Sequence, residues 1–245
     1  MSTNEELLQA ITAGSEQDSS PNIPENLTVL PLRDVIIYPY MIFPVLIGRT
    51  SSLKAVSQAL EKDKFIFAAT QTQASIDEPE LIDVYQHGTI CKILQVIRLP
   101  NNLLKVLVEG VFHGVIEKPI ENPECLEAHI RILKQDDVIQ DAELEAYVRK
   151  TQEAFSAYVS TNKHLPPEIQ SAFENIEDPV RKLFYAAANI DKNVHAKQEI
   201  LQQTSLKMQY KHLLEMLKDE LEVLKLEEEL DTKVADSIQK TQRKY

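Results

Sequence analysis

Apolar residues follow two different periods in the two halves of the chain. Up to about residue 134 they form short runs rich in Val, Ile and Leu, separated by Gly, Pro and Asn, which is typical of strands joined by turns. A single helical pattern interrupts these runs at 50–64, with Thr50 or Ser51 as the expected N-cap. Because a helix does not follow each strand, the order predicts an antiparallel, barrel-like sheet rather than a parallel α/β sheet. The predicted strands are 27–32, 41–48, 65–71, 88–99, 103–110, 111–118 and 125–134.

From residue 141 onward the apolar positions recur with the period of a helix. Asp178 followed by Pro179 is a typical helix start, because Asp caps the first turn and Pro suits the first helical position. Short connections between the helices predict antiparallel packing. The predicted helices of this part are 141–159, 166–176 and 178–190.

The last predicted helix is much longer than the others. No Gly or Pro interrupts the chain from Thr204 to about Lys240, which corresponds to roughly 36 residues and about 54 Å of helix. Leu213, Leu217 and Leu224 form an apolar stripe along it. We expect its far end to project beyond the bundle, and we interpret the stripe as a candidate surface for coupling or oligomerisation.

The stretch 30–49, LPLRDVIIYPYMIFPVLIGR, has no charged or strongly polar residue between Asp34 and Gly48. It is too short to cross a bilayer as a helix. Pro39 and Pro44 favour extended segments broken at a turn or bulge. The run is therefore either core or a binding surface. If it is a surface, aromatic and Met side chains would accept varied apolar partners, and the candidate contacts are Tyr38, Tyr40, Met41 and Phe43. The alternative is that most of the run is core, with Tyr40 and Met41 exposed at the bend.

Composition restricts the possible functions. The chain has 245 residues and a formal net charge of −12, which argues against a nucleic-acid surface because phosphate binding draws on clustered Lys and Arg. Its start lacks a secretory signal, and no run reaches membrane-spanning length, so we expect a cytoplasmic protein without a membrane partner. Cys91 and Cys125 are expected to be reduced packing residues. The polar stretch 1–26 is expected to be a mobile tail.

The sequence lacks the patterns that carry common catalytic chemistry. Its glycines do not form a phosphate-binding loop, its six histidines show no His-Glu-x-x-His spacing, and no serine lies in Gly-x-Ser-x-Gly. We therefore expect no catalytic, cofactor-binding or metal-binding residue in this chain. If the chain has a function of its own, that function is binding.

Several longer segments resemble the amino-terminal region of bacterial Lon proteases. They are LTVLPLRDVIIYPYMIFPVLIGR, TQASIDEPELIDVYQHGTICKILQVIRLPNNLLKVLVEG, LPPEIQSAFENIEDPVRKLFYAAANI and the terminal QRKY. The resemblance covers about 27–245 in order and with similar spacing. The main departure is the turn at 100–102, Pro-Asn-Asn, where many relatives have Asp-Gly.

The resemblance implies a fold and a set of partners. The fold class is α+β, a β-rich, PUA-like pseudobarrel followed by an α-helical bundle that ends in one long helix. The implied parts are a tail at 1–26, a substrate-binding domain at 27–135, a bundle at 136–203 and a connecting helix at 204–245. In the family the subunit continues into an ATPase module and a serine protease domain, so ATP and Mg²⁺ are expected only there.

The resemblance also implies a role for the chain. As an amino-terminal fragment it would recognise unfolded or damaged proteins and assist assembly of a homohexamer, without being an enzyme by itself. The alternative is a stand-alone binding module of the same type with no enzyme attached. Whether the reading frame continues after Tyr245 distinguishes the two.

Overall fold

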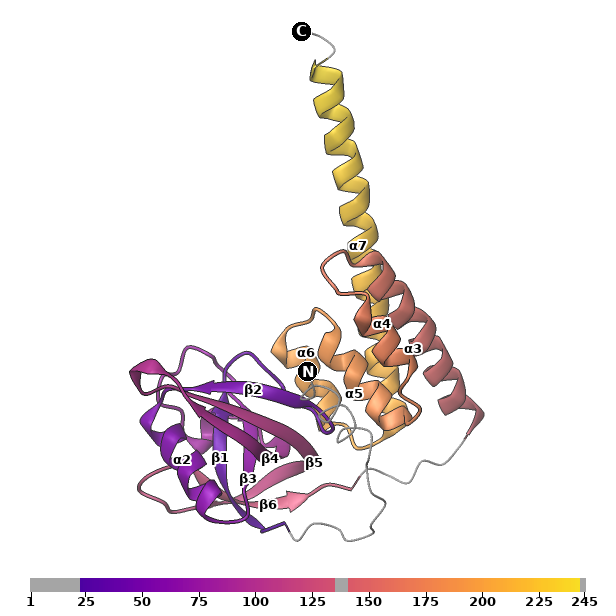
Figure 1. Cartoon of the computed structure of the whole chain (residues 1–245). Coiled ribbons are helices and arrows are strands. Elements are labelled where there is room, and N and C mark those ends of the chain that lie inside the picture. The colour runs from indigo at the N-terminus through magenta and orange to yellow at the C-terminus, as the bar shows by residue number, and fades with distance from the viewer. Residues whose placement is uncertain (1–22, 135–140, 243–245) are drawn as a thin grey trace, which may run out of the picture.

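The computed structural model describes residues 23–134 and 141–242, and the side chains of that part up to residue 235. A β-rich part and a helical part lie side by side, and one helix extends far beyond both (Figure 1). The expected mobile tail falls on 1–26, and its first 22 residues lie outside the described part.

Six strands form one sheet that closes on itself. The order is β2-β5-β4-β3-β1-β6, and β5 pairs with β6 as well, so five strands form a ring and β2 lies at an edge. All pairings are antiparallel except that of β1 with β3. The predicted barrel-like architecture is therefore confirmed. The strands are β1 (Asn26–Leu32), β2 (Ile42–Ile47), β3 (Phe65–Thr70), β4 (His87–Arg98), β5 (Leu104–Ile120) and β6 (Glu127–Ile132).

The two strands predicted at 103–110 and 111–118 are one strand of 17 residues, β5. The prediction ended a strand at Gly110. In the structure Gly110 and Gly114 both lie inside β5, at places where the neighbouring chain leaves no room for a side chain. A Cβ at Gly110 would meet the carbonyl oxygen of Tyr38, and one at Gly114 would press on Ile130. Register shifts along β5 bend it, so that one strand pairs with β2, β4 and β6.

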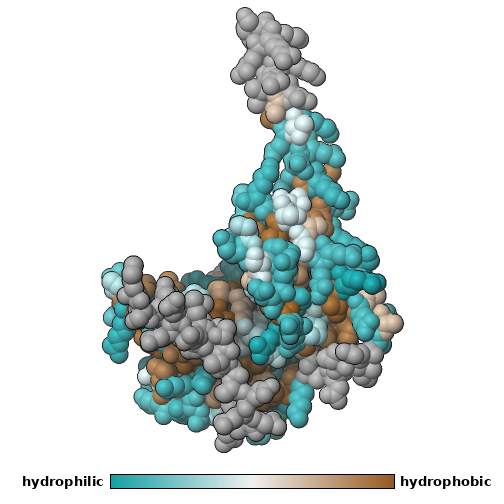
Figure 2. All heavy atoms as spheres, turned by 45° about the vertical axis from the view of Figure 1, so that its right-hand side comes forward, coloured by the Kyte–Doolittle hydropathy of each residue, from teal (hydrophilic) through white to brown (hydrophobic). Residues whose placement is uncertain are grey.

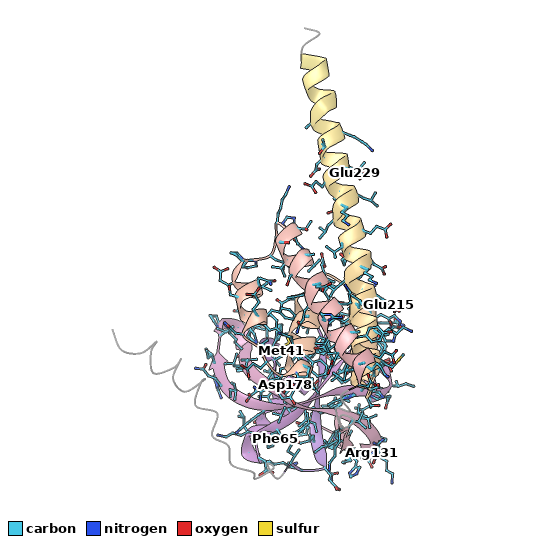
Figure 3. All side chains as sticks on the ribbon, turned by 90° about the vertical axis from the view of Figure 1, so that its right-hand side faces the viewer. Met41, Phe65, Arg131, Asp178, Glu215 and Glu229 are labelled. Atoms are coloured by element: carbon cyan, nitrogen blue, oxygen red, sulfur yellow. The ribbon has the colours of Figure 1, made fainter. Side chains whose placement is uncertain are left out.

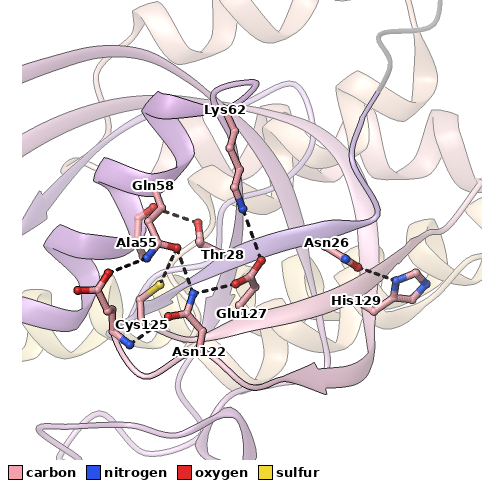
Figure 4. Close-up of polar contacts among 10 residues, drawn as sticks. Asn26, Thr28, Ala55, Gln58, Lys62, Asn122, Cys125, Glu127 and His129 are labelled. Carbon is pink, nitrogen blue, oxygen red and sulfur yellow. Dashed lines mark hydrogen bonds and ion pairs between the residues drawn. The ribbon is translucent and has the colours of Figure 1, made fainter.

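Helix α2 (Thr50–Glu61) covers one side of the barrel and is tied to it by polar contacts (Figure 4). Thr28 donates a hydrogen bond to the carbonyl of Ala55 at 3.0 Å, and the Lys62 ammonium lies 3.6 Å from the Glu127 carboxylate. The expected N-cap, Thr50 or Ser51, is wrong by one or two positions. Arg49 occupies the cap position in an extended conformation without a side-chain cap bond.

Two short 3-10 turns connect strands of the barrel, η1 (Leu81–Asp83) and η2 (Pro100–Asn102). In η2, Asn101 and Asn102 both have positive φ, which Asn tolerates better than most residues. The predicted hairpin turn between β4 and β5 is thus confirmed in position.

The helical part contains five helices in the described residues. They are α3 (Ala142–Thr161), α4 (Glu168–Glu174), α5 (Pro179–Asn189), α6 (Val194–Gln202) and α7 (Leu206–Gln242). Asp178 caps α5 as predicted, accepting a hydrogen bond from the backbone N–H of Val180 at 2.8 Å. Helix α6 was not predicted, because it is short and polar Gln198 interrupts its few apolar positions. It is capped by Asn193, which accepts from the N–H of Ala196 at 2.9 Å.

Helix α7 has 37 residues, which corresponds to about 55 Å. Its first turns belong to the bundle core, where Leu213 and Leu217 are fully buried. Its later turns project from the body (Figure 1), and Figure 2 shows mostly hydrophilic side chains along this region. The predicted boundary at 203/204 therefore separates two segments that share one core. No helix in the described part is long and apolar enough to span a membrane.

Candidate binding surface

The apolar run 30–49 turns sharply in its middle. The backbone N–H of Met41 bonds to the carbonyl of Tyr38 at 3.3 Å, with Pro39 as the second residue of the turn. Tyr40 is the third residue and has φ of 66°, where glycine is usual. Gly110 of β5 stabilises the turn, because its carbonyl accepts from Tyr40 at 2.7 Å and its N–H donates to Met41 at 2.8 Å.

Tyr38 is not an accessible contact residue, which corrects the prediction for this side chain. It is fully buried in the core of the helical part. Its ring stacks on Phe184 of α5 with the ring centroids 5.3 Å apart, and its hydroxyl donates to the carbonyl of Lys197 in α6 at 2.8 Å. Burial raises the pKa of this hydroxyl far above its ordinary value. Tyr38 therefore joins the barrel to the helices.

The other three predicted contacts lie at different depths. Tyr40 is 48% exposed, and the Arg181 guanidinium lies 4.8 Å from its ring centroid. Met41 is half-buried against the helical core, and Figure 3 places it, like Asp178, at the junction of barrel and helices. Phe43 is half-buried against the barrel core. Their contact with a partner stays a prediction.

The most exposed apolar side chains of this run lie on β2. Ile42 is 52% exposed and Leu46 is 63% exposed, while Val45 and Ile47 on either side of Leu46 point into the core. The register places further apolar residues of β4 and β5 on the same outer side. We call this surface the outer sheet face, and it consists of Ile42, Pro44, Leu46, Leu94, Ile97 and Leu107.

The sequence contains a signal for this surface that the prediction did not use. A strand with one side in water should alternate apolar and polar residues, but β2 reads IFPVLI and is apolar on both sides. Ile42 and Leu46 are therefore apolar residues at positions of the strand that face water. Exposed apolar patches with a polar rim mark interaction surfaces.

A cleft of about 520 Å³ lies along β2, between this strand and the end of β1. Val35, Phe43 and Leu46 contribute apolar side chains to its lining, and Arg33 and Arg49 contribute positive charge. We call it the edge cleft. Because Pro44 and Leu46 line the edge cleft and also belong to the outer sheet face, the two surfaces are continuous over β2.

The two arginines of the edge cleft are held by the loop after β3. Arg33 donates to Asp77 at 2.8 Å, and Arg49 donates to the side-chain carbonyl of Gln71 at 2.6 Å. Burial lowers the pKa of the Arg49 guanidinium, and the nearby charge of Arg33 lowers it further. The Arg49 guanidinium nevertheless stays charged near neutral pH.

A pair of histidines lies in the barrel close to α6. Nδ1 of His87 and Nε2 of His113 are 3.0 Å apart, and Gln198 of α6 donates to the backbone carbonyl of His87 at 2.9 Å. Burial and, to a smaller extent, the neighbouring His87 lower the pKa of His113 to about 4, so His113 is neutral near neutral pH. Across the described part of the chain, no cluster of three or more His, Cys, Asp or Glu is placed to hold a metal ion.

The predicted coupling stripe on α7 also needs correction. Leu213 and Leu217 are fully buried inside the subunit and Leu224 is half-buried, so the first two are unavailable to a neighbouring subunit. Apart from Met208 near its start, the large apolar side chains that the described part of α7 exposes lie further along, at Val223, Leu226, Leu230 and Val234. The error arises because the helix period identifies an apolar face without showing where the bundle ends.

The fold is that of the amino-terminal domains of Lon proteases. The N-terminal domain of the Mycobacterium avium complex Lon protease matches with a TM-score of 0.64 at 19% identity, over 79% of this chain and 98% of that one. The Lon N-terminal domain protein from Xanthomonas campestris matches with a TM-score of 0.55 at 11% identity, over 77% and 96%.

Sequence comparison shows the family itself. Residues 26–219 match the model of the ATP-dependent protease La (LON) substrate-binding domain, and the chain therefore belongs to this family. The Lon protease of Escherichia coli K12 is 34% identical over 219 residues, which cover 89% of this chain and 28% of that protein. The Lon protease of Clostridioides difficile is 36% identical over 227 residues, which cover 91% and 29%. The chain thus spans less than a third of the length of these relatives.

Proposed function

We propose that this chain recognises unfolded or damaged proteins for an ATP-dependent protease of the Lon type, and that it acts by binding without a chemical step of its own. The observation that carries the proposal is the outer sheet face, continuous with the edge cleft over β2. Damaged proteins differ from folded ones mainly by exposed apolar segments, so their receptor needs accessible apolar surface. Family membership supports the same role, because the family model is that of a substrate-binding domain.

The first prediction tests this surface. Replacing Ile42 and Leu46 together by Ser is expected to weaken binding of a labelled, permanently unfolded model protein about tenfold, because about 1.4 kcal/mol of apolar contact is lost. Fluorescence anisotropy measures the affinity, and circular dichroism checks the fold. Folding should survive, because both side chains are more than half exposed.

Ile82 provides a matched control for this prediction. It is an equally apolar side chain, 82% exposed, and it lies in η1 away from β2. Ile82→Ser is expected to leave the affinity unchanged. If the Ile42 and Leu46 double variant folds and binds as tightly as the wild type, the outer sheet face is not the binding site.

We also propose that the projecting part of α7 assists assembly with other subunits. Val223, Leu226 and Leu230 are about half exposed and recur at the spacing of one helix face. A long helix that leaves its bundle gains stability when such a face is covered by a second helix. A second copy of this chain is the occupant that fits a homohexamer.

The second prediction concerns this assembly. Replacing Leu226 and Leu230 by Gln is expected to weaken self-association of the chain at least about tenfold, since two apolar contacts at each helix are lost. Sedimentation equilibrium from micromolar to millimolar concentration measures it. Glu227 and Glu229, replaced by Gln, are the control pair on the same helix. A wild-type chain that stays monomeric over this range would contradict assembly through α7 in this chain.

A further inference from the structure

The charged residues among the side chains of the outer sheet face are unevenly distributed. In the row formed by Ile42, Glu109 and Lys92, a carboxylate on β5 lies between an apolar residue and an ammonium. In the row formed by Leu46, Lys105 and Ile97, the ammonium of β5 lies between two apolar residues. The second row therefore has a positive charge at its centre and no carboxylate.

Lys105 is an exposed lysine that lies between two exposed apolar residues, Leu46 and Ile97. Some lysines of the described part are paired, such as Lys54 with Glu124 at 2.7 Å and Lys150 with Glu153 at 2.8 Å. Among the residues that the structure describes, no carboxylate lies within ion-pair distance of the Lys105 ammonium. The exposed apolar neighbours Leu46 and Ile97 would exclude water when a partner covers them, which strengthens any charge contact made there.

We propose that the outer sheet face selects apolar segments that carry an Asp or Glu, and that Lys105 is the residue that makes this choice. The inference rests on the proposed function and names the substrate chemistry of the same surface. A bound lysine would meet Lys105 in a partly desolvated place, where like charges repel. A bound carboxylate would form an ion pair with Lys105, the only charged residue in the row. Selection by charge thus operates on top of the apolar contact that provides most of the affinity.

A local preference for acidic segments contrasts with the negative charge of the whole molecule. With a net charge of −12 the protein as a whole repels acidic partners. This long-range repulsion is screened by salt, whereas a close pair at the covered surface is screened much less. We therefore expect the preference for acidic segments to be visible at physiological ionic strength.

The test uses three labelled peptides of one apolar, unstructured sequence that differ only at a central position, which is Asp, Asn or Lys. Fluorescence anisotropy with the wild-type chain is expected to show binding of the Asp peptide about three- to fivefold tighter than that of the Lys peptide, the range of an ion pair that is partly exposed. Lys105→Glu is expected to reverse this order, and Lys105→Gln to remove it.

Lys118 is the matched control, because it is an exposed lysine of the same strand in the half that pairs with β6. Lys118→Glu changes the net charge as Lys105→Glu does, and it is expected to keep the wild-type order. If Lys105→Glu keeps that order as well, or if the wild type binds the three peptides equally, the inference is overturned. If the three peptides bind equally and Leu46→Ser weakens the binding of all three, the proposed function stands without the inference. If no peptide binds, both the proposed function and the inference are overturned.

Discussion

Replacing Tyr38 by Ala is expected to lower the free energy of unfolding by about 4 kcal/mol, the cost of removing a large buried aromatic side chain. The ring stacks on Phe184, and the space around it is closed by both the barrel and the helices. The hydroxyl bond to the carbonyl of Lys197 is lost as well, and this carbonyl then stays buried without that donor. Urea denaturation followed by circular dichroism measures the change.

Two further variants separate the contribution of the Tyr38 ring to stability from that of its hydroxyl and from that of the neighbouring turn. Tyr38→Phe keeps the ring and is expected to cost about 1 kcal/mol, the usual net value of one hydrogen bond. Tyr40→Ala lies two residues away but at a half-exposed side chain, and it is expected to cost less than about 1 kcal/mol. A Tyr38→Ala chain as stable as the Tyr40→Ala chain would show that Tyr38 does not join the two parts.

Replacing Gly110 by Ala is expected to cost about 3 kcal/mol, at the upper end of the range for overpacking in a closed core. The added Cβ would meet the carbonyl oxygen of Tyr38, which is backbone and cannot rotate away. The strand or the turn must shift, and either movement disturbs the two hydrogen bonds between Gly110 and the turn at Tyr40 and Met41. Thermal and urea denaturation of the purified chain measure the loss.

Gly48 provides the control for this substitution. A Cβ there would come within 2.8 Å of Leu103 Cδ2, which is the mobile end of a side chain and can move. Gly48→Ala is therefore expected to cost less than about 1 kcal/mol. Equal losses for the two variants would mean that the backbone contact between Gly110 and Tyr38 has no special cost.

Local sequence patterns predicted most of the secondary structure, because helix caps, prolines and turn residues act on the backbone within a few positions. Asp178 and Pro179 start α5 as expected, since capping and the fixed φ of proline act within one turn. The hairpin at η2 was also found, because Asn tolerates its positive φ. The division of β5 at Gly110 failed for the opposite reason. That glycine is required by a segment about 70 residues earlier in the chain, and no local pattern contains this contact.

The sequence identified the segment that contains the candidate site, but it did not identify the residues of the outer sheet face. The run 30–49 does provide the bend and β2, and Tyr40 is exposed at the bend as expected, yet Tyr38 faces the helices and the most exposed positions are Ile42 and Leu46. Residues that alternate along a strand point to opposite sides, so one register decides which set meets water. In an all-apolar strand such as β2 the sequence contains no polar residue to mark that side.

The sequence by itself determined the class of this protein, because fold and family depend on patterns spread over almost its whole length. It showed the division into a β-rich and a helical part, the long last helix and the relation to Lon proteases. Only the tertiary structure decided that the same apolar run both joins the two parts through Tyr38 and presents the outer sheet face through Ile42 and Leu46. The physical reason is that exposure depends on what packs against a side chain, and at these positions the packing comes from β5, α5 and α6, far away in the chain.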